Sequence, residues 1–258
     1  MAIVSYQTIK VRFEESICFL QLDRLESANA INGQLVAECS EVLSICQEAA
    51  TVVVLSGSPE AFCVGADFGA LADPATDSYG AYNGPGPLYD LWLKLATGPY
   101  VTVAHVRGKA NAGGIGFVAA CDIVLADATA QFSLSELLFG LYPACVLPFL
   151  IRRISHQRAH YLTLMTHPIS AEQAFTWGLV DALESDSEAL LRRHLLRLRR
   201  LSKVAVTRYK DYMSTIGVPL AGLKSSAIAG NLEVFSDPAN LKAIIRYVES
   251  GVFPWEKF

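Results

Sequence analysis

The sequence predicts a single α/β domain. The chain has 258 residues, 52% of them apolar, which is enough to bury a sizeable core. Three short apolar runs rich in β-branched residues, at 51–55, 101–106 and 123–125, are typical of buried strands. Segments with helical periodicity lie before and between these runs, and such alternation favours parallel strands covered by helices.

Composition and charge exclude several classes of function. A net charge of −4 argues against a nucleic-acid surface. No apolar run approaches the length of a membrane span, and no basic-then-apolar leader pattern is present, so we expect a cytoplasmic protein that binds no membrane. The six cysteines show no metal-binding or redox spacing. We therefore expect them to be small buried side chains in a reducing compartment, and we expect no metal and no cofactor.

The first elements are a hairpin and a helix. Residues 6–13 and 17–22 alternate polar and apolar side chains around a short turn, which predicts two antiparallel strands. Residues 24–32 form a loop that contains Ala30. Residues 35–48 have helical periodicity, and Asn32 is placed near the N-cap of that helix.

Two small-residue turns follow buried strands. The first is Phe62-Cys-Val-Gly-Ala-Asp67, in which Asp67 is placed to cap a new helix. The second is Gly108-Lys-Ala-Asn-Ala-Gly-Gly-Ile-Gly116. A strand that enters a glycine-rich turn at a helix start points free N–H groups at one spot, which suits a phosphate or an acyl oxyanion. The spacing matches neither common phosphate-binding motif, and the second turn by itself is equally consistent with close packing.

Residues 72–87 are rich in glycine and proline, which predicts a surface loop rather than a packed helix. The loop follows the first turn, so it could form a lid in which Tyr79 and Tyr82 touch substrate. The alternative is that both tyrosines are exposed loop aromatics. A helix is expected at 88–96.

Glu136 lies inside an otherwise apolar segment, 132–142. Burying a carboxylate is costly unless it is paired or protonated. The residues alone leave two readings open, a buried salt bridge and a functional acid or base.

The C-terminal third is predicted to be helical, at 148–166, 170–177, 187–201, 225–235 and 240–250, with a loop at Pro219 and Gly222 and a docked tail at 253–258. The helix at 187–201 carries a leucine stripe and many arginines. A solvated helix face is the simple explanation for those arginines, and a docking patch is the other.

Taken together, the two turns, followed by Cys121-Asp-Ile123, closely resemble the signatures of the crotonase (enoyl-CoA hydratase) superfamily. The resemblance covers nearly the whole chain. It implies a crotonase fold, a spiral of repeated ββα units. Residues 1–200 would form the core with the thioester site, and residues 201–258 a helical region for oligomerisation and pocket closure. It also implies a homotrimer or hexamer.

The resemblance also implies roles for individual residues. The N–H groups of Ala66 and Gly113 would bind the thioester oxygen, with Asp67 and Phe68 beside the substrate. Ala30 would lie in the loop that contacts the carrier arm; a plain helix start is the alternative for that loop. Glu136 follows Gly113 by 23 positions, which matches the superfamily's second catalytic glutamate. Ordinary hydratases carry another glutamate at the position of Gly116, so the two-carboxylate water clamp is missing.

The resemblance is strongest to the hydratase-like dehydratases of polyketide β-branching cassettes. Three segments carry it: 111–117, 133–148 and the arginine-rich 190–201. It implies dehydration of 3-hydroxy-3-methylglutaryl (HMG) on an acyl carrier protein (ACP) to 3-methylglutaconyl-ACP, followed by a partner decarboxylase. Lys109 and Asn111 are candidates to hold the free carboxylate of the substrate. The expected contacts for the acidic carrier protein are Arg192, Arg197 and Arg200.

Two other functions stay open. One is a CoA-thioester hydratase, isomerase or decarboxylase of general metabolism, although the missing glutamate disfavours the hydratase. The other is a non-catalytic binding protein of the same fold, which the presence of Glu136 and of both turns disfavours.

Overall fold

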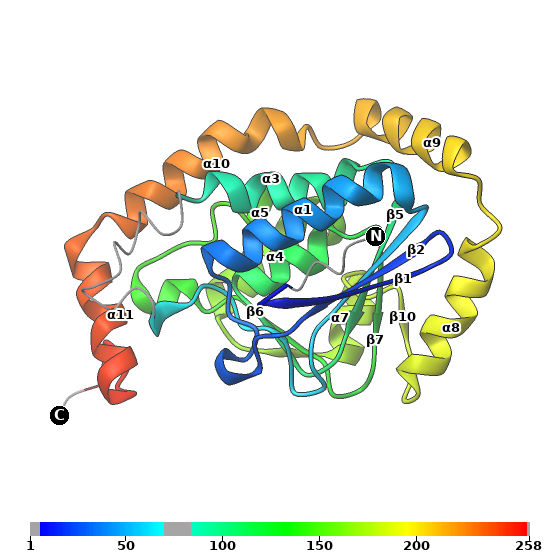
Figure 1. The fold of residues 1–258 in the computed structure, drawn as a ribbon. Coiled ribbons are helices and arrows are strands. Elements are labelled where there is room, and N and C mark those ends of the chain that lie inside the picture. The colour runs from blue at the N-terminus through cyan, green and yellow to red at the C-terminus, as the bar shows by residue number, and fades with distance from the viewer. Residues whose placement is uncertain (1–5, 70–83, 257–258) are drawn as a thin grey trace.

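The computed structural model describes residues 6–69 and 84–256, and it consists of two sheets with helices packed around them (Figure 1). The larger sheet has the strand order β1-β2-β3-β5-β7-β10. Its first two strands, β1 (Ile9–Glu14) and β2 (Ile17–Leu22), form the predicted antiparallel hairpin, and every further pair in this sheet is parallel. The expected parallel strands are β3 (Val52–Ser56), β5 (Val101–Val106) and β7 (Ile123–Ala126).

The smaller sheet has the order β4-β6-β8-β9. Three of its strands, β4 (Ala61–Cys63), β6 (Lys109–Asn111) and β8 (Gln131–Ser133), each directly follow a strand of the larger sheet. Each pair of strands then leads into helical structure, which is the repeated ββα arrangement of the crotonase fold. The prediction of fold class is confirmed, and the sequential pairs bring the ends of β4, β6 and β8 to one place.

Helices cover both faces of the larger sheet. On one side lie α1 (Gly33–Ala49), α3 (Gly86–Thr97), α4 (Gly113–Ala120) and α5 (Leu147–Ile154), which share the main apolar core with the sheet. On the other side α8 (Ser187–Leu198) packs its leucine stripe against the sheet. The predicted N-cap of α1 is confirmed, because the Asn32 side chain accepts a hydrogen bond from the Leu35 N–H.

The C-terminal helices cross the top of the molecule in Figure 1 and descend at its left edge. They are α9 (Lys203–Ile216), α10 (Leu220–Phe235) and α11 (Pro238–Ser250). α10 packs on α3 and α5, while α11 packs on the 3-10 helix η2 (Glu136–Phe139). The remaining short elements are η1 (Leu25–Ser27), α6 (His156–Met165), β9 (Ile169–Ser170), α7 (Ala171–Trp177) and β10 (Ala182–Leu183).

Three expectations for the C-terminal helices were wrong or incomplete. The single helix predicted for 148–166 is two helices, because Ser155 has a φ of +75° and breaks the chain direction between α5 and α6. The loop predicted at Pro219 and Gly222 is instead the start of α10, since a proline suits the N-terminal boundary of a helix. Helix α9 was not predicted.

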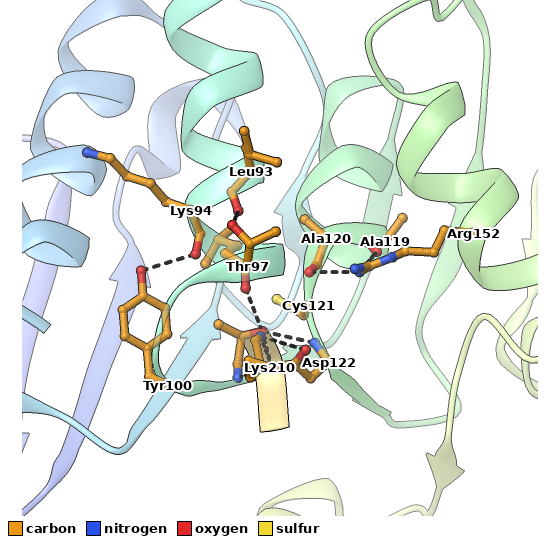
Figure 2. A network of polar contacts seen from close by, with 12 residues as sticks. Leu93, Lys94, Thr97, Tyr100, Ala119, Ala120, Cys121, Asp122, Arg152 and Lys210 are labelled. Atoms are coloured by element: carbon orange, nitrogen blue, oxygen red, sulfur yellow. Dashed lines mark hydrogen bonds and ion pairs between the residues drawn. The ribbon is translucent and has the colours of Figure 1, made fainter. Parts of the chain in front are cut away.

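A polar network fixes the far end of α4 (Figure 2). The guanidinium of Arg152 donates to the carbonyls of Ala119 and Ala120, the last residues of the helix. Asp122, just beyond them, accepts hydrogen bonds from the Thr102 N–H and hydroxyl and from the Lys210 ammonium of α9. A cation at a helix C-terminus stabilises the helix, so these contacts fix the C-terminal end of α4.

All six cysteines are buried and free, as expected. Within the described residues, no helix is both long enough and apolar enough to cross a membrane.

Candidate active site

The two predicted turns meet in the structure. Ile31 bridges to the first turn, since its N–H donates to the Gly65 carbonyl and its own carbonyl accepts from the Asp67 N–H. Gly65 has a φ of +97°, and a Cβ at this position would lie 2.7 Å from Cβ of Ala112 in the second turn. Only glycine allows the two backbones to approach this closely.

The N–H groups of Ala66 and Gly113 donate no hydrogen bond among the described residues. Gly113 is the first residue of α4, so its N–H is one of the unpaired donors of the first helical turn, at the positive end of the helix dipole. Ala112 before it has φ +49° and ψ −119°, an unfavourable conformation for a residue with a Cβ. This strained peptide sets the direction of the Gly113 N–H, and the two free donors form a candidate oxyanion hole.

Glu136 begins η2, directly after the loop that follows β8. The residue as a whole is half-buried, yet its Oε2 atom is out of reach of solvent and has no hydrogen-bond partner among the described residues. Burial raises the pKa of this carboxyl to about 7, against the smaller opposing effect of the Glu136 and Ser135 N–H groups. No basic side chain is recorded as its ion-pair partner among the described residues, which excludes the buried salt bridge as an explanation.

Asn111 connects the second turn to the segment that carries Glu136. Its Nδ2 donates to the Ser135 hydroxyl over 2.9 Å, and its Oδ1 accepts from the Ser133 hydroxyl over 2.8 Å. The amide is therefore largely used within the protein. This geometry favours a positioning role for Asn111 over the role of a ligand for the substrate's carboxylate.

Asp67 also makes a protein contact. Its carboxylate accepts a hydrogen bond from Arg24 Nη2 over 2.9 Å, and the same guanidinium donates a hydrogen bond to the Ala30 carbonyl. This ion pair joins the 24–30 loop to the first turn. Ala30 itself is buried and does not line the cavity, whereas its neighbour Ile31 does.

The turns and Glu136 open into one cavity of about 640 Å³. Its walls include Ala66, Asp67, Phe68, Lys109 and Asn111 among the predicted site residues. The C-terminal region contributes as well, through Asn231, Phe235, Tyr247 and Phe253. Such a mainly apolar cavity with a few polar groups is typical of a small-molecule site.

The other predicted residues are distributed as follows. Phe68 packs edge-to-face on Phe139, at 5.9 Å between ring centroids. Lys109 is exposed at the cavity wall. Tyr79 and Tyr82 lie outside the described residues. Arg192, Arg197 and Arg200 are exposed, do not line the cavity, and have no carboxylate partner in the described part of the chain.

Sequence reasoning missed Trp92, which lies on α3 and lines the cavity beside the second turn. It also missed Tyr247 and Phe253. An isolated tryptophan in an apolar helix is normally a core residue, so only the long-range packing of α3 on α4 brings Trp92 into the site.

Comparisons with known proteins identify the family. Residues 12–257 match the enoyl-CoA hydratase/isomerase family. The chain is 57% identical over 257 residues to bacillaene synthase dehydratase PksH of Bacillus subtilis, covering 99% of both chains. A crystal structure from Bacillus subtilis described as a polyketide biosynthesis enoyl-CoA hydratase (pksH) superposes with a TM-score of 0.91 and 55% identity, over 97% of this chain and 100% of that one.

A more distant relative shows the breadth of the family. The 1,2-epoxyphenylacetyl-CoA isomerase of Escherichia coli is 31% identical over 199 residues, which cover 70% of this chain and 73% of that protein. Family membership thus leaves the reaction to be argued from the site. Because the family match extends along nearly the full length of the chain, the protein belongs to the enoyl-CoA hydratase/isomerase family of the crotonase superfamily.

Proposed function

We propose that the protein is a hydro-lyase that removes water from a 3-hydroxyacyl thioester, and that its substrate is HMG-ACP, converted to 3-methylglutaconyl-ACP. The observation that carries this proposal is the buried, unpaired carboxyl of Glu136 in the cavity of the two turns, with glycine at position 116. The similarity to a protein named as a bacillaene synthase dehydratase supports it.

Each group has a role in the reaction. The N–H groups of Ala66 and Gly113 bind the thioester oxygen and stabilise the enolate that forms when the α-proton leaves. The Glu136 carboxylate takes that proton, and the resulting acid delivers it to the 3-hydroxyl, which departs as water. A tertiary hydroxyl leaves more readily than a secondary one, so a single carboxyl can serve both steps.

The rest of the assignment follows the same logic. Lys109 is the cation at the cavity wall and is assigned to the free carboxylate of the acyl group. The acyl group arrives on the phosphopantetheine of a carrier protein, so the enzyme needs no cofactor of its own. A decarboxylase of the same cassette would use the product. We assign the enzyme to the cytoplasm as a homotrimer or hexamer.

Incubation with HMG-ACP, followed by intact-protein mass spectrometry, tests the function directly. We expect loss of one water from the carrier-bound acyl group, and a fall of about 10²–10⁴-fold in rate for Glu136→Gln with folding unchanged. Faster turnover of HMG-CoA than of HMG-ACP would favour the CoA-thioester alternative. Binding of both without any change in mass would indicate a non-catalytic member of the family.

A further inference from the structure

The 3-10 helix η2, which begins with Glu136, packs on the C-terminal helices in an apolar cluster separate from the main core. Phe139 of η2 and the fully buried Leu141 just beyond it contribute two members of this cluster. The other two buried members are Val234 of α10 and Ile244 of α11. The segment that carries the candidate acid/base is therefore seated on the C-terminal region.

A side-chain amide of α11 holds the end of η2. Nδ2 of Asn240 donates to the Gly140 carbonyl over 3.2 Å and to the Val234 carbonyl of α10 over 2.9 Å. Gly140 is the C-cap of η2, and its N–H donates to the carbonyl of Glu136. The Leu141 N–H donates to the same carbonyl over 3.1 Å. Asn240 is thus connected to the backbone of Glu136 through one intervening residue.

The fit between Asn240 and Gly140 is close. A Cβ at Gly140 would lie 2.1 Å from Oδ1 and 2.9 Å from Cγ of Asn240. Gly140 also has a φ of +76°, a conformation that favours glycine. The two residues are 100 positions apart in the chain, so this contact exists only when α11 lies on η2.

The local structure of α11 does not require asparagine at position 240. The N-cap of this helix is Asp237, whose side chain accepts a hydrogen bond from the Ala239 N–H over 2.8 Å. Asparagine has a lower helix propensity than alanine or leucine, so it costs some stability inside a helix. Asn240 is not among the described residues that line the cavity, which argues against a contact with substrate. The two carbonyls that it holds are the explanation for its amide.

We propose, on the basis of the proposed function, that Asn240 is a positioning residue that holds η2 on the C-terminal helices and so fixes the carboxyl of Glu136 in the cavity. Apolar contacts are non-directional, whereas two hydrogen bonds from one amide define where the end of η2 lies. A small displacement of an acid or base lowers the rate strongly and affects binding less. The C-terminal helices thus contribute to the reaction itself, beyond closing the cavity.

Two variants remove the contact from opposite sides. Asn240→Leu keeps the approximate size of the side chain and removes both donors. Gly140→Ala places a Cβ against the amide oxygen and forces Asn240 aside. Asn240→Ala, which only truncates a half-buried side chain of a helix, takes their place if either does not fold. Asp237→Ala is the matched control, because it removes the N-cap of α11 and leaves both partners of Asn240 in place.

Kinetics with HMG-ACP and denaturant melts are measured for each protein. We expect kcat to fall about 10-fold in Asn240→Leu and in Gly140→Ala, with KM changed by less than about 2-fold. The double variant should be no slower than the slower single variant, because both changes remove the same contact. Asp237→Ala should melt at lower denaturant concentration and keep the wild-type kcat. A wild-type kcat in Asn240→Leu, or an equal loss in Asp237→Ala, would overturn the proposal.

The ionisation of Glu136 gives a second readout that needs no substrate. Burial raises the pKa of this carboxyl to about 7, so a loosened η2 that admits water should lower the pKa towards 4.5. Infrared titration of the carboxyl band, with Glu136→Gln as the blank, measures this pKa in each protein. We expect a fall of roughly one pH unit in Asn240→Leu and none in Asp237→Ala.

This titration separates the positioning role from the proposed function. If the pKa falls in Asn240→Leu but not in the control, while wild-type protein leaves HMG-ACP intact, the positioning role is supported and the proposed function is wrong. If wild-type protein dehydrates HMG-ACP but neither kcat nor the pKa responds to Asn240→Leu, the function stands and the positioning role is wrong.

Discussion

Asn111 donates its amide hydrogen to the hydroxyl of Ser135 over 2.9 Å, and this bond joins the strand before the second turn to the segment that carries Glu136. Glu136 is the next residue after Ser135. The position of its carboxyl relative to the candidate oxyanion hole therefore depends on a contact between side chains that are 24 positions apart in the chain.

Removing this contact should reduce turnover more than binding. In Ser135→Ala the Asn111 amide loses its acceptor, and Glu136 is held less firmly. We expect kcat to fall about 10-fold with KM nearly unchanged, since small displacements of a catalytic group have large effects on rate. Ser135→Thr keeps the hydroxyl and should restore most of the activity. A Ser135→Ala enzyme with wild-type kcat would show that the bond does not position Glu136.

The pH dependence should report Glu136. Burial raises its pKa to about 7, so below that pH the free enzyme holds mainly the neutral acid, which cannot take the α-proton. We expect kcat/KM to rise about tenfold per pH unit up to pH 7 and then to level off. A midpoint near the ordinary glutamate value of 4.5 would contradict the burial of this carboxyl.

The raised pKa of Glu136 should make the stability of the fold fall as pH rises, whereas activity should rise with pH. The folded protein holds the Glu136 proton more tightly than the unfolded chain does, so this contribution to stability is complete below pH 4.5 and is lost as pH rises through 7. Glu136→Gln should therefore gain roughly 1–3 kcal/mol relative to wild type between pH 5 and pH 8. Urea melts of both proteins at the two pH values measure the difference.

Gly113→Val should inactivate the enzyme without unfolding it. Its Cβ would lie 2.8 Å from Cδ1 of Ile31, the end of a flexible side chain that also lines the cavity, so the added methyl groups should fill the space beside the candidate oxyanion donors. We expect a loss of about 10²–10³-fold in kcat/KM, as for removal of an oxyanion donor. Circular dichroism should show native structure. An active, well-folded variant would be incompatible with the oxyanion assignment.

Gly114→Ala is the contrasting variant. Its Cβ would lie 2.1 Å from the carbonyl oxygen of Cys63, which is backbone and cannot move aside. We expect this smaller substitution to destabilise the fold itself.

Lys210→Met should destabilise the protein. Lys210 is 6% exposed, and its ammonium lies 2.6 Å from the Asp122 carboxylate. Figure 2 shows this ion pair. The variant leaves the carboxylate half-buried without its cation, which we expect to cost roughly 2–4 kcal/mol in the free energy of unfolding. Lys10→Met removes a pair in which the lysine is 66% exposed, and should cost less than about 1 kcal/mol. Equal effects in denaturant melts would contradict this difference.

The arginines of α8 and of the turn after it remain a prediction for carrier docking. Arg192, Arg197 and Arg200 carry no carboxylate partner in the described part of the chain, whereas Arg193 pairs with Glu184. Arg197→Glu with Arg200→Glu should raise KM for HMG-ACP, with a salt-sensitive KM in the wild type, and should barely change activity on a short pantetheine thioester.

The controls for this prediction follow from the structure. Arg193→Glu tests a paired arginine on the same helix and should have a smaller effect. Because α8 contributes nothing to the cavity wall, unchanged KM in the double variant would move the docking surface to the cavity side, where Lys109 is the exposed cation.

Local sequence patterns were enough to predict the fold class and to single out the two turns and Glu136 as candidate site elements. Strands, hairpin and the Asn32 cap follow from local patterns, and a paired-glycine turn or a lone glutamate in an apolar segment is visible in any linear reading. The boundaries between consecutive helices were harder to predict. Ser155 adopts a positive φ that its residue type does not demand, so a continuous apolar pattern concealed the boundary between α5 and α6.

The surroundings of Glu136 follow from tertiary packing and not from any local pattern. Trp92 lies 44 positions before it and reaches the cavity because α3 packs on α4, and Tyr247 arrives from the last helix. Asp67 and Asn111, predicted to touch substrate, use their polar atoms on Arg24 and Ser135. Such partners come together through long-range packing, and the helical or strand periodicity of a single sequence does not reveal them. The candidate groups are therefore visible in the sequence, while their burial and orientation are set only when segments distant in the chain pack together.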